Sequence, residues 1–245
     1  MKKEVFTNCG GISIDEIEPR GIPNDIEERV NAKNLTELVF ILDRSGSMSG
    51  MEKDTIGGFN SMIEKQKQED GMVYVSTVLF SNTSKVLHDR VDISKIEPMT
   101  EKDYQVGGCT ALLDAIGGAI YHISNVHKYA RKEDVPAKTV FLITTDGMEN
   151  ASMEYSSSRV KEMIKRQEEK CGWEFFFVAA NIDAVETASR IGIRKERAAN
   201  YDVEEGTDVM FCSMSKNISE YRKTGKFRED WNEEIEATVK NKQKK

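Results

Sequence analysis

LVFILDRSGSMSG, residues 38–50, is the stretch on which the prediction of the fold depends. Its apolar beginning predicts a fully buried strand that ends at Asp43. The residues after Asp43 are small and polar, and a helical pattern follows them. Asp43, Ser45 and Ser47 stand at alternate positions, so their side chains can converge on one point if the loop is locally extended.

The side chains of this loop carry oxygen donors only. One carboxylate and two hydroxyls suit a hard cation such as Mg²⁺ or Mn²⁺, and they do not suit zinc or copper. A simpler interpretation is that Ser45 or Ser47 caps the next helix and that Gly46 eases the turn. The stretch by itself leaves both interpretations open.

The composition indicates a globular, acidic protein. The 245 residues include 38% hydrophobic ones, which is enough for a sizeable core, and 31% charged ones, which predict a well-solvated surface. Acidic residues outnumber basic ones by 42 to 35, and the formal net charge is −7. Because a negative chain has no general attraction to a polyanion, we expect neither nucleic acid nor an anionic membrane as a partner.

Targeting and redox signals indicate a cytoplasmic protein. The N-terminus lacks an apolar stretch of signal-peptide length, and no run of the sequence is long enough to span a bilayer. The cysteines are widely spaced and form no CxxC pair; they are Cys9, Cys109, Cys171 and Cys212. In a chain of this size without an export signal, we expect them to remain thiols.

Apolar strands alternate with helical patterns along most of the chain. Strands are expected at residues 36–43, 73–80, 138–146, 173–181 and 198–203, and at 85–91 as an edge strand. Helices are expected at residues 51–69, 111–129, 158–170, 183–191 and 206–224. This alternation predicts an α/β fold with a doubly wound, mostly parallel central sheet, one antiparallel edge strand and helices on both faces.

Composition also divides the chain into three parts. Residues 1–34 contain Pro19, Gly21 and Pro23 and show no clear period, so we expect an N-terminal arm or linker. Residues 35–222 form the predicted domain. Residues 223–245 are expected to be a charged C-terminal tail, frayed and solvated, with a basic docking segment as the alternative.

Two acidic residues and a threonine mark the loops at one edge of the predicted sheet. Asp43 and Asp146 both follow buried strands, and Thr110 lies at a loop-to-helix junction in GGCTAL. Since doubly wound sheets bind ligands at the carboxyl ends of their strands, the three loops can meet there and form a metal site. The local alternatives are that Thr110 is an ordinary N-cap and that Asp146 and Gly147 form an ordinary turn.

Together these motifs resemble the von Willebrand factor A (VWA) domain family. DRSGS, which contains Asp43, Ser45 and Ser47, matches the DxSxS signature of the family. Thr110 matches its isolated threonine, and Asp146, in TTDG, matches its distal aspartate. The resemblance implies a Rossmann-like α/β fold with a complete metal-ion-dependent adhesion site (MIDAS). In that site, these five positions surround a divalent cation, Mg²⁺ or Mn²⁺, directly or through water.

The resemblance also implies a function. Mg²⁺ needs octahedral oxygen coordination, and three hydroxyls with few direct carboxylates leave its charge partly uncompensated. In the family, an Asp or Glu of a partner protein completes the metal shell, so we expect a metal-dependent protein–protein interaction module. The chain looks like an intracellular, bacterial-type, single-domain member. Such members often serve larger assemblies, including AAA+ ATPase and bacterial stress-response systems.

Two other functions stay open at the level of the sequence. One is a metal-dependent hydrolase or phosphotransferase on a Rossmann-like sheet, although haloacid-dehalogenase-like phosphatases need a second Asp where this chain has Ser45. No GxxxxGK[ST] or GxGxxG motif is present, and we interpret His88, His122 and His127 as surface or packing residues. We therefore expect no enzyme activity. The other alternative is a scaffold in which the metal only stiffens the loops.

Overall fold

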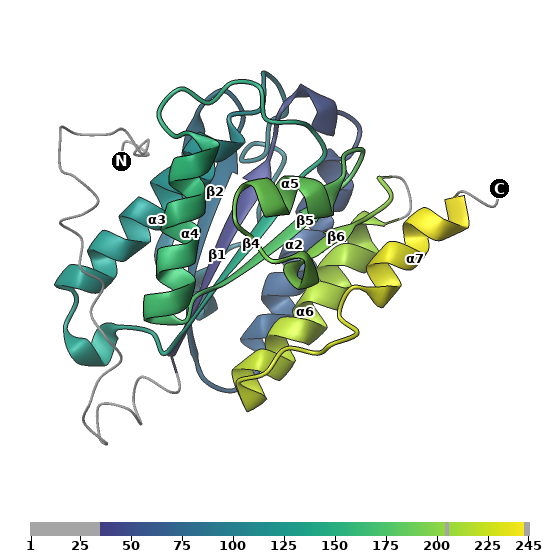
Figure 1. Cartoon of the computed structure of the whole chain (residues 1–245). Helices are drawn as coiled ribbons and strands as arrows, with labels where there is room; N and C mark the ends of the chain where they lie inside the picture. Colours follow the sequence, from purple (N-terminus) through teal and green to yellow (C-terminus); the bar gives the residue numbers. More distant parts are fainter. Residues whose placement is uncertain (1–34, 204–205, 243–245) are drawn as a thin grey trace.

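A six-stranded sheet forms the central layer of the protein (Figure 1). The computed structural model describes residues 35–203 and 206–242, so the expected arm over residues 1–34 lies outside the described residues. The strands are β1 (Leu35–Asp43), β2 (Met72–Phe80), β3 (Ser84–Asp92), β4 (Lys138–Thr145), β5 (Glu174–Ala179) and β6 (Ala198–Asn200). Their order across the sheet is β3-β2-β1-β4-β5-β6.

The pairing of the strands confirms the fold class expected from the sequence. β1 pairs in parallel with β2 on one side and with β4 on the other, and β5 and β6 continue the parallel arrangement. Among the described strands, β3 alone runs antiparallel, at the edge next to β2. Because the chain moves from β1 first to β2 and later to β4, the winding reverses between β1 and β4. The loops at their carboxyl ends therefore border the crevice of a doubly wound sheet.

Helices cover both faces of the sheet (Figure 1). The α-helices are α2 (Glu52–Lys67), α3 (Leu112–Tyr129), α4 (Ser157–Cys171), α5 (Ala184–Arg190), α6 (Thr207–Thr224) and α7 (Glu233–Lys242). The 3₁₀ turns are η2 (Gly46–Met48), η3 (Ile93–Lys95), η4 (Lys132–Asp134) and η5 (Lys195–Arg197). Helices α3, α4 and α5 pack on one face, and α2, α6 and α7 pack on the other. Within the described residues, no helix combines the length and apolar character that crossing a membrane requires.

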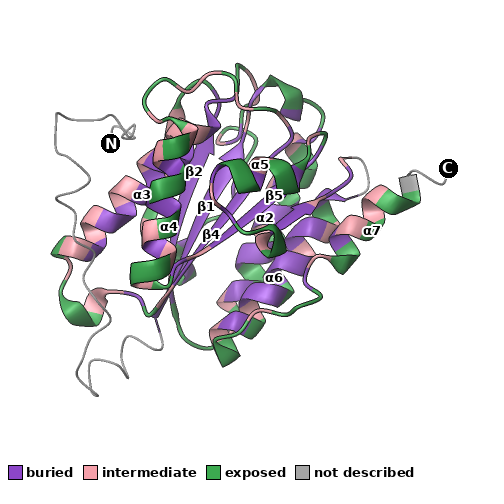
Figure 2. Ribbon diagram, viewed as in Figure 1, coloured by how far each residue is buried: buried purple, intermediate pink, exposed green. Residues whose placement is uncertain are grey.

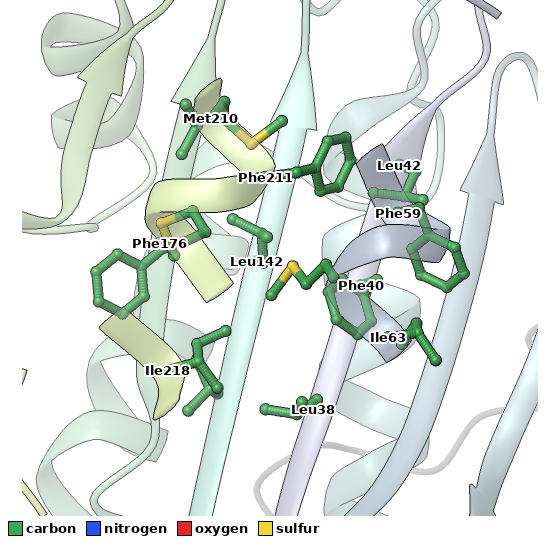
Figure 3. Close-up of a cluster of buried hydrophobic side chains, with 14 of the residues drawn as sticks. Leu38, Phe40, Leu42, Phe59, Ile63, Leu142, Phe176, Met210, Phe211 and Ile218 are labelled. Carbon is green, nitrogen blue, oxygen red and sulfur yellow. The ribbon is translucent and has the colours of Figure 1, made fainter. Parts of the chain in front are cut away.

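The face that carries α2 and α6 holds a core of aromatic and aliphatic side chains (Figure 3). Phe40 and Leu42 alternate along β1, so both point to this face. Phe59 of α2 packs edge-on against Phe40, with the ring centroids 5.2 Å apart. A Cβ atom at Gly58 would lie 2.3 Å from the ring of Phe211 on α6. This glycine therefore permits the close contact between α2 and α6.

The opposite face has its own core, built on the intervening residues of β1. Val39 and Ile41 are buried there together with Ile116 of α3 and Ile164 of α4. Figure 2 shows the outcome: β1, β2, β4 and β5 are buried almost throughout, whereas the helices are exposed on the side away from the sheet. Because both faces of β1, β4 and β5 are covered, these strands are nearly continuous apolar runs in the sequence.

One charged side chain is buried between the sheet and α3. Glu37 of β1 is fully buried, and its carboxylate accepts a hydrogen bond from Arg90 Nε at 2.8 Å. The second carboxylate oxygen lies 2.5 Å from Nε2 of His127. These partners satisfy a carboxylate that would be costly to bury alone.

We expect Glu37→Gln to lower the free energy of unfolding by about 2 kcal/mol, because the amide loses the charge and one strong acceptor. Equilibrium unfolding in urea measures this change. Glu101→Gln, at an exposed position, is the matched control and should alter stability by less than about 0.5 kcal/mol. Equal stabilities of the two variants would contradict a stabilising role for Glu37.

The C-terminal segment differs from the frayed tail expected from the sequence. After α6, Gly225 adopts a φ of 75°, and the chain turns back to form α7 beside α6 (Figure 1). Trp231 is 4% exposed and Ile235 is 0% exposed. Charged and polar residues surround these two apolar residues in the sequence, so the segment shows no apolar pattern that would predict a packed helix. The expectation of a frayed, solvated tail is therefore wrong for residues 225–242.

The described cysteines are free thiols, as expected. Cys109 is exposed, and Cys171 and Cys212 are half-buried; Cys9 lies outside the described residues. Burial raises the pKa of the Cys171 thiol to about 11, so this group stays protonated and unreactive at neutral pH.

Candidate metal centre

Three loops meet at the carboxyl edge of the sheet, where β1 and β4 end. The first loop joins β1 to α2, the second leads into α3, and the third joins β4 to α4. The residues expected to hold a metal lie on these loops, and we call them the oxygen cluster: Asp43, Ser45, Ser47, Thr110 and Asp146. Contacts between the loops hold all five in one place.

Both oxygens of the Asp43 carboxylate are fixed by hydrogen bonds. The backbone N–H of Ser45 donates to Oδ1 at 2.7 Å, and Oγ1 of Thr145 donates to Oδ2 at 2.5 Å. The hydroxyl of Tyr104 also donates to the carbonyl oxygen of Asp43. Asp43 is fully buried, so its carboxylate has one defined position at the end of β1.

Two serines connect the first loop to the third. The hydroxyl oxygens of Ser45 and Ser47 lie 3.1 Å apart. Ser47 Oγ donates to Oδ1 of Asp146 at 2.5 Å. Since the serines follow β1 and Asp146 follows β4, these hydrogen bonds link the two strand ends where the winding of the sheet reverses.

Thr110 reaches the cluster from the second loop. The distance of the Thr110 hydroxyl from Gly147, which follows Asp146 on the third loop, defines its position. A Cβ atom at Gly147 would lie 3.1 Å from Ser47 Oγ and 3.3 Å from Thr110 Oγ1. Both hydroxyls therefore lie against the same glycine, and the lack of a side chain there leaves room for them.

Backbone hydrogen bonds lock the first and second loops together. The N–H of Gly46 donates to the carbonyl of Gly108, and the N–H of Gly107 donates to the carbonyl of Arg44, each at 2.9 Å. Gly108 has a φ of 86°, and a Cβ atom there would lie 2.0 Å from Oδ1 of Asn82. The glycine is needed for both reasons, because the positive φ and the close contact each exclude a side chain.

The structure contradicts the simpler interpretation of the hydroxyls as helix caps. Ser45 precedes η2, but its side chain makes no capping hydrogen bond. Helix α2 begins after Met51 and helix α3 after Ala111, and neither of these residues caps its helix with a side chain. Thr110 is therefore not the N-cap of α3. The Asp146 side chain, which pairs with Ser47 of another loop, does more than close a local turn.

The two carboxyl groups of the cluster are in an unfavourable environment for negative charge. Burial raises the pKa of both Asp43 and Asp146, and repulsion by Asp146 adds to the shift of Asp43. Hydrogen bonds from Thr145 and the serines act in the opposite direction. Within residues 35–203 and 206–242, neither carboxylate forms an ion pair. A divalent cation would supply the missing positive charge, so these residues fit a metal ion.

The cluster is open on one side. Asp43, Ser45, Thr110 and Asp146 are at most 4% exposed, whereas Ser47 is exposed.

The described part of the chain contains no group of three or more His, Cys, Asp or Glu residues that could hold a metal. The donors here are mostly hydroxyls, which suit Mg²⁺ or Mn²⁺ rather than zinc or copper.

Comparison with solved structures identifies the fold. Proximal thread matrix protein 1 from the mussel byssus matches with a TM-score of 0.52 and 13% identity, over 76% of this chain and 46% of that one. The von Willebrand factor type A structure from Catenulispora acidiphila matches with a TM-score of 0.51 and 11% identity, over 75% of this chain and 42% of that one. The chain has the von Willebrand factor type A fold. It spans less than half the length of either structure, and no family model or curated protein matches its sequence.

In this VWA fold the histidines serve the sheet and its helices rather than the cluster. His88 Nδ1 lies 3.0 Å from the hydroxyl of Thr77 on the neighbouring strand. His122 pairs with Asp89 at 2.7 Å, and His127 pairs with the buried Glu37. These contacts agree with their interpretation as surface and packing residues.

Several residues outside the oxygen cluster hold the loops of the VWA fold in place. The side-chain oxygen of Asn150 accepts a hydrogen bond from the backbone N–H of Thr110 at 2.9 Å. The backbone N–H of Asn150 donates to the carbonyl oxygen of Thr110 at 3.1 Å. Asn82 accepts from the N–H of Cys109 at 2.9 Å, and Thr145 holds Asp43. All three follow or end a strand of the sheet. Polar residues just past the carboxyl ends of predicted strands are the signal that could have revealed them.

Proposed function

We propose that this chain is a metal-dependent protein-interaction module. In this proposal the oxygen cluster holds one divalent cation, Mg²⁺ or Mn²⁺, and an Asp or Glu of a partner protein completes the coordination. The VWA fold, the resemblance of the three motifs to a MIDAS, and the convergence of the three loops support it.

The observation that carries the proposal is the pair of buried carboxylates without a cationic partner among the described residues. Burial of an unpaired charge is costly, and a protein normally avoids it by pairing the charge or binding a metal. Asp43 ends β1 and Asp146 follows β4, so a cation between them would also connect the two loops. With three neutral hydroxyls among its five donors, the bound ion would keep an affinity for an anionic oxygen from outside.

Each residue of the cluster has a distinct position in this proposal. Asp43 and Ser45 are buried and held by hydrogen bonds, so they would form the fixed inner wall of the site. Thr110 and Asp146 would supply oxygen from the other two loops. Ser47 is exposed, so the partner's acidic side chain would approach past it.

The proposal also assigns the partner and the setting in general terms. We propose that the partner is a protein, that it belongs to a larger ATPase or stress-response assembly, and that the encounter takes place in the cytoplasm. The acidic net charge of −7 supports a specific metal-bridged contact over general attraction to nucleic acid or anionic lipid.

We propose that the chain is not an enzyme. A phosphatase mechanism on this sheet would need a general acid two residues after Asp43, and Ser45 stands there. Each histidine contacts residues outside the cluster: Thr77, Asp89 and Glu37 are their partners. No described histidine is therefore placed to transfer a proton at the cluster.

Metal titration tests the proposal directly. Calorimetry with Mg²⁺ or Mn²⁺ and chelator-treated protein is expected to show saturable binding of about one ion per chain. Because the ion would bind the folded state, thermal unfolding should shift to higher temperature. The expected stabilisation is about 2.7 kcal/mol at a metal concentration 100-fold above Kd.

Two variants serve as controls for this titration. Asp43→Ala is expected to lose binding, whereas Asp54→Ala, at an exposed position on α2, should retain it. A folded wild-type chain without saturable binding would contradict the metal site. Loss of binding in both variants would show that the effect does not belong to the oxygen cluster.

A further inference from the structure

The loop between β4 and α4 exposes two apolar side chains. We call residues 147–156 the methionine loop; Met148 in it is 68% exposed and Met153 is 94% exposed. By contrast, two other exposed apolar residues lie at the amino ends of the strands, away from the oxygen cluster. They are Met72 at the start of β2 and Tyr129 at the end of α3. The two loop methionines are therefore apolar groups on the same edge as the oxygen cluster.

Glu149 fixes the middle of the methionine loop. Its carboxylate accepts from the backbone N–H groups of Ala151 at 2.9 Å and Ser152 at 2.7 Å, and from the Ser152 hydroxyl at 2.7 Å. It also accepts from the N–H of Leu113 on α3 at 2.9 Å. One side chain thus holds the loop in shape and ties it to the next element.

Asp114 of α3 fixes the far end of the loop. Its carboxylate accepts from the N–H groups of Met153 at 2.8 Å, Glu154 at 2.9 Å and Tyr155 at 2.8 Å. The ring of Tyr155 then packs on Gly117, where a Cβ atom would lie 2.4 Å from the ring. Both carboxylates are engaged with backbone groups, so the methionines project from a loop of defined conformation.

This arrangement exposes apolar groups that contribute nothing to the fold. A single exposed apolar residue needs no explanation, but two in one short, firmly held loop form a potential contact surface. Methionine adapts its shape to different partners and is enriched at protein interfaces. A loop that is already ordered also loses little conformational entropy when a partner binds.

The methionine loop and the oxygen cluster are continuous. Met148 follows Gly147, whose backbone lies against the hydroxyls of Ser47 and Thr110. Asn150 of the same loop forms two hydrogen bonds with the backbone of Thr110. Met148 therefore lies between two residues that contact the cluster, and its side chain is the exposed apolar group nearest to the cluster along this loop.

We infer that the methionine loop is the apolar half of a two-part recognition surface, with the oxygen cluster as the other half. The occupant is a protein segment in which the metal-binding Asp or Glu has an aliphatic or aromatic neighbour, and this neighbour packs on Met148 and Met153. The inference rests on the proposed function, because the acidic residue must engage the cluster. It adds a sequence preference that metal coordination alone does not provide.

A peptide selection tests this preference. A displayed library of random peptides with a fixed central Asp is bound to the full chain in Mg²⁺ and eluted with EDTA, so that only metal-dependent binders are sequenced. Aliphatic and aromatic residues should be enriched beside the Asp. A selected peptide should bind roughly tenfold more tightly than its counterpart with serine at that neighbouring position.

Variants separate the two halves of the surface. In Met148→Gln/Met153→Gln the enrichment and the tenfold difference should disappear, while EDTA-eluted Asp peptides remain. Met72→Gln, at the exposed methionine of the opposite edge, should behave like wild type. Asp-dependent, EDTA-eluted binding without any preference at the neighbouring position would overturn the inference and leave the proposed function intact. If EDTA elutes no peptide from the wild-type chain, the proposed function fails and the inference fails with it.

Discussion

Thr110→Ala is expected to abolish metal-dependent binding while the fold persists. Changes to groups that only orient a metal ligand commonly cost 10–100-fold in metal affinity, so the loss of one of the five proposed oxygen donors should cost about 100-fold. The hydroxyl of Thr110 caps no helix, so its removal should change stability little in the absence of metal. Calorimetric titration with Mn²⁺ measures the first effect, and urea unfolding in chelator measures the second.

The control is Thr83→Ala, an exposed threonine in the turn between β2 and β3. It should bind Mn²⁺ and the EDTA-eluted peptides like wild type. The same pair of variants distinguishes a metal bridge from a scaffold whose loops the metal merely stiffens. If peptide binding survives Thr110→Ala while Mn²⁺ binding is lost, the metal does not bridge the two molecules and the scaffold interpretation is correct.

The sequence predicted the sheet well because burial on both faces leaves a simple signal. Each central strand is a nearly continuous apolar run, and helices with one apolar face separate the runs. Strand ends were placed to within a few residues, since Asp43 and the polar residues after Thr145 interrupt the apolar runs there.

The oxygen cluster could be found because its members belong to local motifs. DRSGS, GGCTAL and TTDG each stand out within a few residues, and the predicted sheet places them at one edge. The roles of the supporting residues could not be predicted from these motifs, although Thr145 itself lies in TTDG. Thr145 acts on Asp43 across 102 positions of the sequence, and Asn150 acts on Thr110 across 40. Such contacts arise only when the loops have come together.

The ordered conformation of the methionine loop could not be predicted from the sequence either. The stretch after Asp146 is polar and suggests a solvated connection. Its order comes from Asp114 and Glu149, whose carboxylates accept hydrogen bonds from backbone groups within the loop and on α3. A charged side chain in a predicted loop suggests solvent exposure, whereas here two of them replace the regular hydrogen bonds that the loop lacks.

The C-terminal segment shows the opposite problem, because two buried residues are hidden among many charges. Trp231 packs edge-on against Phe176 of β5, with the ring centroids 5.0 Å apart. Its indole N–H donates to the carbonyl of Glu196 at 3.0 Å. Ile235 is fully buried next to it, and Thr238 Oγ1 accepts from the N–H of Asp202 at 3.0 Å. These contacts attach the C-terminal segment to β5, to η5 and to Asp202 just after β6, although the composition of the segment is that of a solvated tail.

Trp231→Ala is therefore expected to lower the free energy of unfolding by about 3–5 kcal/mol, the usual cost of removing a buried indole and leaving a cavity. Urea unfolding followed by circular dichroism measures the change. Tyr129→Ala provides the matched control, since this aromatic residue is 75% exposed and its loss should cost less than about 0.5 kcal/mol.

The comparison of these two aromatic variants decides whether α7 belongs to the cooperative fold. If Trp231→Ala is as stable as Tyr129→Ala, α7 is a dispensable appendage and the fold ends with α6, as the sequence suggested. If the large loss appears in a single transition, the ring of Phe176 on β5 needs its cover from Trp231 in the segment that leads into α7. In that case β6, which is only three residues long, depends on the C-terminal segment. Truncation after α6 would then destabilise the edge of the sheet.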